Sequence, residues 1–154
     1  MNKYLREPSM ADVEMLSKNL RERDVEECMA HGLTPLQSLT FGFKHSRSLY
    51  TLVSPEGVPF GMLGIGDSPL PGLGAIWMLG SKDLERYPMT LVRQSKTILD
   101  KLFLETPYDG FYNYAYSKNT LHVQWLKWLG FSLLRTVQLP PFQRDFIEFV
   151  KLRG

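Results

Sequence analysis

The sequence predicts one α+β domain, residues 1–154, in which a mixed sheet of six to seven strands is flanked by about four helices. Three observations support this fold class. The length of 154 residues suits a single domain, hydrophobic residues make up 44% of the chain, and strand-like segments alternate with helix-like ones. Such an alternation places helices on both faces of a mixed sheet.

The amino-terminal third predicts a short strand followed by two or three helices. Residues 4–7 are the strand candidate, and Ser9 followed by Asp12 has the spacing of a capping box, which begins a helix. A helical pattern resumes further along and is ended by Gly32. Pro35 then begins another helical stretch.

The middle of the chain predicts a meander of three strands and then the longest helix. A turn signal at 54–57 and a glycine- and proline-rich loop at 66–74 separate the strands. The strands are expected at 49–53, 58–65 and 75–79. Pro88 suits the first turn of the helix that follows, and apolar residues recur on one face of that helix as far as Leu102.

The carboxy-terminal part predicts a strand, a helix and a closing pair of strands. Residues 111–116 form an aromatic-rich strand, and a helix runs from about Asn119 to Leu129 and is ended by Gly130. The closing strands are expected at 131–139 and 145–152, joined around two consecutive prolines.

Composition excludes several functional classes. The net charge of +2 comes without a clustered Lys/Arg stripe, which argues against nucleic-acid binding. No apolar run reaches the ~18 residues of a membrane span, and the amino terminus has no signal-like apolar region. The single cysteine, Cys28, predicts a buried thiol in a reducing compartment. His31, His45 and His122 have no metal-ligand spacing, so no metal site is expected.

One segment carries a resemblance to a known family. In residues 117–131 an asparagine, Asn119, begins a helix that ends in Leu-Gly-Phe, with Gly130 eleven residues later. This arrangement resembles the GNAT superfamily of acyl-CoA N-acyltransferases. Residues 76–81 and the spacing Asn119-x-x-His122 also look like a family of small GNAT-like proteins of short-tailed coliphages that act in virion morphogenesis. The resemblance implies acetyl-CoA as the cofactor and no metal.

The resemblance implies cofactor-binding positions, with one clear departure. GNAT enzymes bind the pyrophosphate of the cofactor through the motif Arg/Gln-x-x-Gly-x-Gly/Ala, between the fourth strand and the long helix. In this chain the corresponding residues 81–88 lack glycine and include two acidic residues. Lys82 and Arg86 could offer charge to a phosphate there, or be surface charges on a solvated loop. The remaining cofactor-binding candidates are Trp77, Met78, Leu79 and Asn119, with a core role as the alternative for Trp77.

The family's catalytic groups are also depleted. Strand 75–79 has no glutamate to act as general base. Leu126 occupies the position where the family often has a tyrosine that acts as general acid. We expect His122 to act as a base or to polarise the acceptor, with a hydrogen-bonded packing histidine as the alternative. Tyr114 and Tyr116 share one face of their strand and are candidate replacement acids, unless that face is only a half-buried aromatic surface.

Two functions of different classes follow. The first is an acetyl-CoA-dependent N-acetyltransferase acting on a protein or small-molecule amine. The second is a non-catalytic accessory factor in virion morphogenesis, located in the host bacterial cytoplasm or as an internal virion protein, with phage structural or assembly proteins as partners. Its contact points would include Leu70, Leu73 and Phe142 in the two proline-rich loops. The missing glycines, the missing strand acid and Leu126 favour the second.

Overall fold

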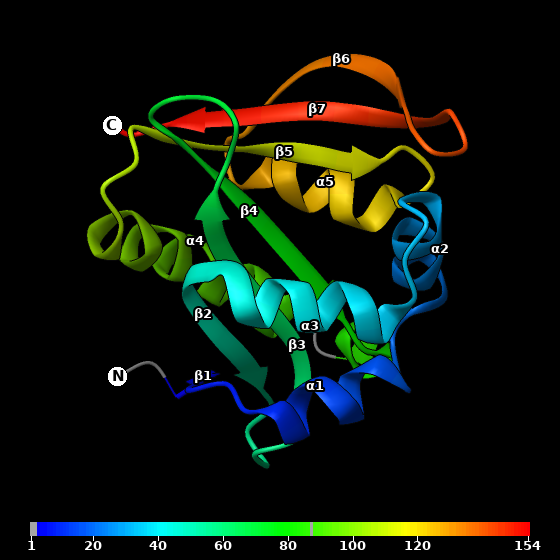
Figure 1. Cartoon of the computed structure of the whole chain (residues 1–154). Helices are drawn as coiled ribbons and strands as arrows, with labels where there is room; N and C mark the ends of the chain where they lie inside the picture. Colours follow the sequence, from blue (N-terminus) through cyan, green and yellow to red (C-terminus); the bar gives the residue numbers. More distant parts are fainter. Residues whose placement is uncertain (1–2, 87) are drawn as a thin grey trace.

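Seven strands form one mixed sheet in the order β1-β2-β3-β4-β5-β7-β6, as the computed structural model shows for residues 3–86 and 88–154 (Figure 1). Neighbouring strands are antiparallel except β4 and β5, which run parallel. The strands are β1 (Leu5–Arg6), β2 (Ser46–Val53), β3 (Pro59–Asp67), β4 (Leu73–Gly80), β5 (Gly110–Tyr116), β6 (Ser132–Leu139) and β7 (Arg144–Leu152). This is the mixed α+β architecture that the sequence predicts.

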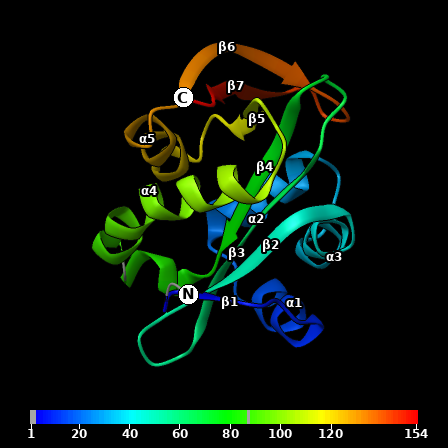
Figure 2. The same ribbon diagram turned by 90° about the vertical axis from the view of Figure 1, so that its left-hand side faces the viewer.

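Helices cover both faces of the sheet. Figure 2 shows α4 and α5 on one face and α1 and α3 on the other. The described residues form five α-helices and one short 3-10 helix, whereas the sequence predicts about four helices. They are α1 (Met10–Ser17), α2 (Glu22–Ala30), α3 (Pro35–His45), the 3-10 helix η1 (Lys82–Arg86), α4 (Pro88–Glu105) and α5 (Thr120–Trp128).

Local signals in the sequence fix most of the element ends. Ser9 and Asp12 form the predicted capping box at α1, since each side chain bonds to the backbone N–H of the other. Pro88 is the first residue of α4, and Gly130 after α5 has the left-handed φ of 92° that favours glycine at this position. Five strands are longer than predicted, whereas β1 and β6 are shorter, and Leu73 lies half-buried in β4 rather than in an exposed loop.

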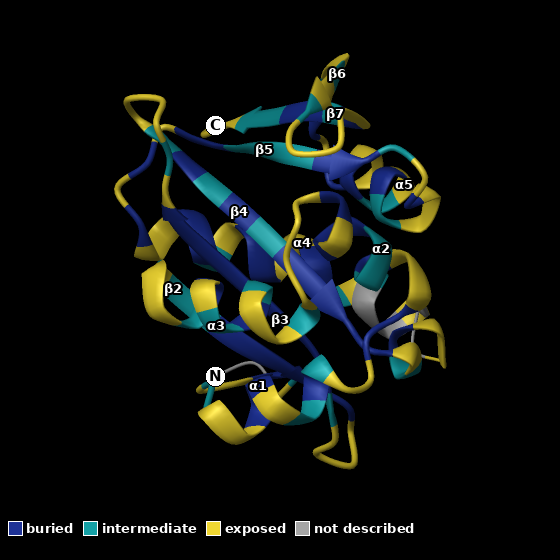
Figure 3. Cartoon of the chain, turned by 45° about the vertical axis from the view of Figure 1, so that its right-hand side comes forward, coloured by how far each residue is buried: buried dark blue, intermediate teal, exposed yellow. Residues whose placement is uncertain are grey.

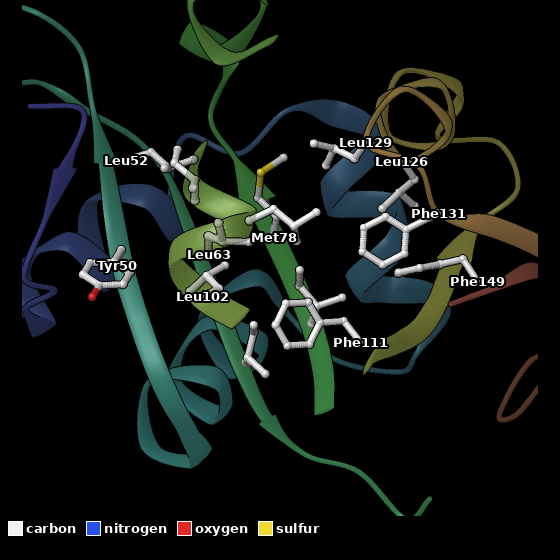
Figure 4. Close-up of a cluster of buried hydrophobic side chains, with 14 of the residues drawn as sticks. Tyr50, Leu52, Leu63, Met78, Leu102, Phe111, Leu126, Leu129, Phe131 and Phe149 are labelled. Carbon is white, nitrogen blue, oxygen red and sulfur yellow. The ribbon is translucent and has the colours of Figure 1, made fainter. Parts of the chain in front are cut away.

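The main core lies between the sheet and the helices α4 and α5. Figure 4 shows side chains of β2, β3, β4, α4 and α5 meeting there, and Met78 lies near the centre of them. A second cluster lies on the opposite face, where α1, α2 and α3 cover β3 and β4. The outer strand β6 is mostly exposed (Figure 3), so the buried side chains concentrate around β3, β4 and β5.

Arg153 ties the end of α4 to the carboxyl terminus of the chain. Its guanidinium donates to the carbonyl oxygens of Phe103 at 2.7 Å, Thr106 at 2.9 Å and Tyr108 at 2.6 Å. These are carbonyls at and just beyond the helix end, where partners within the helix are missing.

We therefore expect Arg153→Ala to lower the free energy of unfolding by about 1–2 kcal/mol, because several charge-assisted hydrogen bonds are lost from a partly exposed site. Urea denaturation measures this change. Lys151→Ala, two residues earlier on β7, is the matched control. Equal destabilisation by both variants would contradict this role of Arg153.

Candidate functional site

The site begins where the parallel strands β4 and β5 separate. They pair only at Leu73↔Gly110, Gly74↔Phe111 and Ala75↔Tyr112. We call the gap that opens between the two strands beyond these pairs the β4–β5 fork. Asn113 lies where this gap begins, and its side-chain amide donates to Ile76 O at 2.8 Å. Beyond this point the strands diverge, and α2 lies across the open end in Figure 1. Two facing strand edges are thereby left for other groups to bond.

Two carboxylates of α2 bond the far ends of these edges. Asp24 accepts a hydrogen bond from Gly80 N at the end of β4, at 2.8 Å. Glu27 accepts one from Tyr116 N at the end of β5, at 2.6 Å. Because backbone groups alternate in direction along a strand, Met78 N–H and C=O face the fork, between Ile76 and Gly80. A ligand entering the fork would meet the edge of β4 at Met78.

Two cavities meet at this fork. The α5 cavity, of about 220 Å³, is mostly apolar and is lined by β4, η1, α4, α5 and the start of α2. The α3 cavity, of about 500 Å³, lies on the other side of the sheet and is lined by α2, α3 and the strands β3, β4, β5 and β7. Met78 and His122 line both cavities. A molecule in one cavity and a molecule in the other would therefore approach each other beside His122.

His122 is paired with a carboxylate at the meeting point. Its Nδ1 lies 3.8 Å from Glu27 Oε1, an ion-pair distance that is too long for a direct hydrogen bond. Both side chains are close to nine-tenths buried. Burial lowers the pKa of His122, but the carboxylates of Glu27 and Asp24 more than offset this, so the pKa is raised above its ordinary value. The structure therefore gives His122 a position suited to proton transfer.

Asn119 occupies the predicted place before α5, but its side chain does not cap the helix. It is fully buried, donates to Asp24 Oδ1 at 2.7 Å and accepts from Arg21 Nη1 at 3.3 Å. Arg21 Nη1 also lies 3.0 Å from Asp24 Oδ1. The expected N-cap bond is thus replaced by a buried network that joins α5 to α2. Burial raises the pKa of Asp24, although Arg21 and the Gly80 N–H act against this shift.

The turn after β4 offers few free amides to a phosphate. Ser81 N donates to Phe60 O, Lys82 N to Asn19 O, and Leu84 N to Ser81 O. Asp83 N donates to Ser81 Oγ. With Gly80 N bonded to Asp24, five consecutive amides already have protein acceptors. A glycine-rich cradle depends on free N–H groups at this place, so the departure seen in the sequence also appears in the hydrogen bonding.

Lys82 and Arg86 lie at the two ends of η1, where the sequence analysis expects phosphate charge or a solvated loop. Both are exposed, and Arg86 lies 3.6 Å from Asp83. The segment is a short helix rather than a loop, and Tyr87 lies outside the described residues. Leu84 is the residue of η1 that lines the α5 cavity, and Lys82 and Arg86 do not line it.

The three candidates on β4 divide between the two cavities. Met78 lines both, whereas Trp77 and Leu79 line the α3 cavity. Trp77 is held in place because its indole N–H donates to Ser46 Oγ at 2.9 Å, and a methyl group at Gly42 would overlap its ring. The side chain of Trp77 therefore forms a wall of the α3 cavity, on the face opposite α4 and α5.

The two candidate tyrosines share one face of β5, as predicted, but only one of them lines the α3 cavity. Tyr114 lines the α3 cavity, and its hydroxyl lies 2.6 Å from that of Tyr112 and 3.3 Å from Glu148 Oε2. Tyr116 packs with Ala30 and Phe146 in a buried cluster against which Tyr114 also packs, but Tyr116 does not line the α3 cavity. Tyr116 contributes its backbone N–H to the fork, where this group donates a hydrogen bond to Glu27.

Several residues of the site are not among the sequence candidates. Arg21, the N-cap residue of α2, and Asp24 and Glu27 within α2 are buried, although charged residues on an amphipathic helix usually face solvent. Their spacing of three residues places them on one face of the helix, which is the signal that could have found them. Trp125 and Trp128 of α5 also line the α5 cavity.

Three further expectations can be compared with the structure. Cys28 is buried, as predicted, and burial raises the pKa of its thiol to about 11, which disfavours a nucleophilic role. Among the described residues, no group of three or more His, Cys, Asp or Glu side chains could hold a metal ion. None of the described helices has the length and apolar character needed to cross a membrane.

Comparison with known proteins finds likeness in structure only. No family model matches the sequence, and no curated protein matches it. Solved structures of GNAT acetyltransferases, in contrast, superpose over almost the whole chain. The aminoglycoside acetyltransferase AAC(6')-Ib, solved with ribostamycin and coenzyme A, is 17% identical, covers 97% of this chain and 92% of its own, and has a TM-score of 0.71.

Two other solved structures show the same likeness. A GCN5-related N-acetyltransferase from Kribbella flavida is 16% identical, covers 97% of this chain and 96% of its own, and has a TM-score of 0.68. The ribosomal-protein-S5-alanine acetyltransferase from Vibrio fischeri is 14% identical, covers 99% of this chain and 94% of its own, and has a TM-score of 0.67. The shared feature is the fold, which the sequence resemblance predicts.

Proposed function

We propose, on the premise that this chain has the GNAT fold, that it is an acyl-CoA-dependent N-acyltransferase. One observation carries the proposal: two cavities on opposite faces of the sheet meet at the β4–β5 fork, and His122 lines both. An acyl donor in the α5 cavity and an amine in the α3 cavity would come together beside a titratable group. Alignment of two reactants in this way contributes a large part of the rate acceleration in transfer reactions.

The α5 cavity suits the pantetheine arm of an acyl donor. Its walls are largely apolar, with side chains such as Val92, Leu121 and Trp125, and Met78 presents a backbone donor and acceptor at the fork. At the phosphate end, Lys82 and Arg86 supply charge, while the amides from Gly80 to Leu84 are already bonded within the protein. Phosphate recognition would therefore depend on side chains.

Acetyl-CoA supplies the acyl group as a thioester: the amine nitrogen bonds to the carbonyl carbon, the C–S bond breaks, and CoA leaves as a thiol. Glu27 faces Nδ1 of His122, which leaves Nε2 for the amine. His122 Nε2 takes the proton that the amine nitrogen loses and passes it to the departing sulfur. Met78 N–H holds the thioester region against the edge of β4.

A thermal-shift titration with acetyl-CoA and desulfo-CoA tests the proposal. At 100 times the dissociation constant, binding should stabilise the protein by about 2.7 kcal/mol, which raises Tm by roughly 5–10 °C for a domain of this size. Lys82→Ala/Arg86→Ala should reduce the shift at a fixed ligand concentration. Lys44→Ala/Arg144→Ala, which removes the same charge from exposed positions elsewhere, should not. A flat response in the unaltered protein would contradict acyl-CoA binding.

A second candidate function is a non-catalytic accessory role in phage virion morphogenesis, with phage structural or assembly proteins as partners. The internally bonded amides from Gly80 to Leu84 favour it, because they remove the usual phosphate cradle. It predicts no thermal shift with acetyl-CoA and a stable complex with a phage protein. Phe142 and Leu70, exposed by 59% and 41%, are its candidate contact points. Fold alone does not separate the two functions.

A further inference from the structure

The α3 cavity has the chemistry of a selective site for one class of amine, an inference that rests on the proposed acyltransferase function. Its volume of about 500 Å³ is that of an ordinary small-molecule site. Its walls carry aromatic and apolar side chains from four elements: Phe41 of α3, Trp77 of β4, Tyr114 of β5 and Phe149 of β7. Among the described residues that line it, none is Lys or Arg.

The two acidic residues of this cavity differ in how far their charge is already balanced. Asp67, at the end of β3 and largely exposed, has one carboxylate oxygen 3.0 Å from Arg47 Nε, and Tyr108 donates to the same oxygen. Glu27 is buried at the fork, where its Oε1 accepts from Tyr116 N at 2.6 Å and lies 3.8 Å from His122 Nδ1. When His122 is neutral, as it must be to act as a base, Glu27 is the carboxylate at the reacting end that is left to attract a cation.

The far part of the cavity presents an apolar surface to solvent. Phe41 is 64% exposed and Leu33 is 38% exposed, although both line the cavity. The ring of Phe41 lies against that of His45, with centroids 4.4 Å apart. Trp77 of β4, which also lines the cavity, is held by Ser46 and by the close approach of α3 at Gly42. A flat apolar group of a ligand could therefore pack against side chains that need little rearrangement on binding.

We propose that the acceptor is a primary amine with a single positive charge, carried on an apolar group of aromatic size. The ammonium would lie at Glu27 and His122, and the apolar group would pack between Trp77 and Phe41. A polycation is a poor ligand for this cavity. Each further ammonium would lose its hydration, at a cost in free energy, without gaining a free carboxylate. The other acid of the cavity, Asp67, is already paired with Arg47.

Two sources could supply this chemistry, a free arylalkylamine or the amino terminus of a peptide that begins with an aromatic residue. Calorimetric titration of the full chain, without acetyl-CoA, measures the binding of each directly. The probes are 2-phenylethylamine and Phe-Gly-Gly. Their comparators are ethylamine, which lacks the apolar group, 2-phenylethanol, which lacks the charge, Asp-Gly-Gly, spermidine and ribostamycin.

We expect 2-phenylethylamine or Phe-Gly-Gly to bind about tenfold more tightly than every comparator. This corresponds to a difference of about 1.4 kcal/mol in binding free energy. Phe41→Ala should weaken that binding about threefold to tenfold, and it should fold normally because the side chain is exposed. Phe142→Ala removes an equally exposed phenylalanine outside the α3 cavity and is the matched control. The two probes distinguish a small amine from a peptide as the source.

Tighter binding of spermidine or ribostamycin would overturn the proposal, as would equal binding of ethylamine and 2-phenylethylamine. An effect of Phe41→Ala no larger than that of Phe142→Ala would also overturn it. Acetyl transfer, assayed in parallel, separates this proposal from the function on which it rests. Selective amine binding without transfer contradicts only the acyltransferase function, whereas transfer without selectivity for the aromatic amine contradicts only the acceptor class.

Discussion

Replacing His122 with glutamine is expected to lower kcat/KM for acetyl transfer by about 10²–10⁴-fold, the usual contribution of a positioned general base. Glutamine keeps a polar side chain at the meeting point of the two cavities but cannot take a proton. The binding of acetyl-CoA should change little, because His122 contacts the reacting end of the site. Steady-state kinetics and the thermal-shift titration together separate these two effects.

The pH dependence gives a sharper form of the same prediction. A base must be neutral to act, and the pKa of His122 is raised above its ordinary value because the carboxylates of Glu27 and Asp24 outweigh burial. Activity should therefore rise with pH through a pKa above the ordinary histidine value of about 6.5. Glu27→Gln removes the largest of the raising effects and should move this acidic limb to lower pH.

Lys127→Gln is the matched control for His122→Gln, since it changes an exposed residue on the same helix. It should leave both kcat/KM and the pH profile unchanged. If His122→Gln retained the activity and the acidic limb of the unaltered protein, His122 would be a packing residue, the alternative that the sequence left open.

The sequence predicts those features that depend on neighbours in the chain. The capping box of Ser9 and Asp12, the start of α4 at Pro88 and the left-handed Gly130 all follow from local backbone chemistry. The order of strands and helices follows from apolar periodicity. The segment without glycines after Gly80 is also the segment whose backbone amides, up to Leu84, are bonded within the protein.

The fork, in contrast, depends on contacts that no local pattern contains. Arg21 and Asn119 are 98 residues apart in sequence, yet their side chains bond in the structure. Asn119 looks like a helix cap in sequence, but the buried pair of Arg21 and Asp24 provides stronger partners for its amide. Periodicity correctly places Tyr114 and Tyr116 on one face of β5, where both pack at the cluster of Ala30 and Phe146. It does not predict that Tyr114 also lines the α3 cavity, whereas Tyr116 does not.

Arg21→Met is expected to cause the largest loss of stability, about 3–5 kcal/mol, because it leaves a buried carboxylate without its cation. Arg21 and Asp24 have side-chain exposures of 6% and 4%, and they lie 3.0 Å apart. The contact of Arg21 with Glu85 adds little to this effect, since Glu85 is 65% exposed. Urea denaturation measures the loss.

A second substitution tests whether the unpaired charge is the cause. Asp24→Asn keeps an oxygen that can accept from Gly80 N but removes the negative charge. Arg21→Met/Asp24→Asn should therefore be more stable than Arg21→Met alone, by about 1–3 kcal/mol, which is the range of coupling between residues in contact. A double variant that is less stable than Arg21→Met would show instead that the loss comes from the missing packing of the arginine side chain.

The loss should also depend on pH in a definite direction. Burial already raises the pKa of Asp24 in the folded protein, and removal of Arg21 raises it further. A raised folded-state pKa gives stability that is present below the unfolded carboxyl value of about 4 and is lost as pH rises through the folded value. The deficit of Arg21→Met relative to the unaltered protein should therefore be smaller in acid than at neutral pH. The same deficit at both values would rule out an unpaired Asp24 carboxylate as its cause.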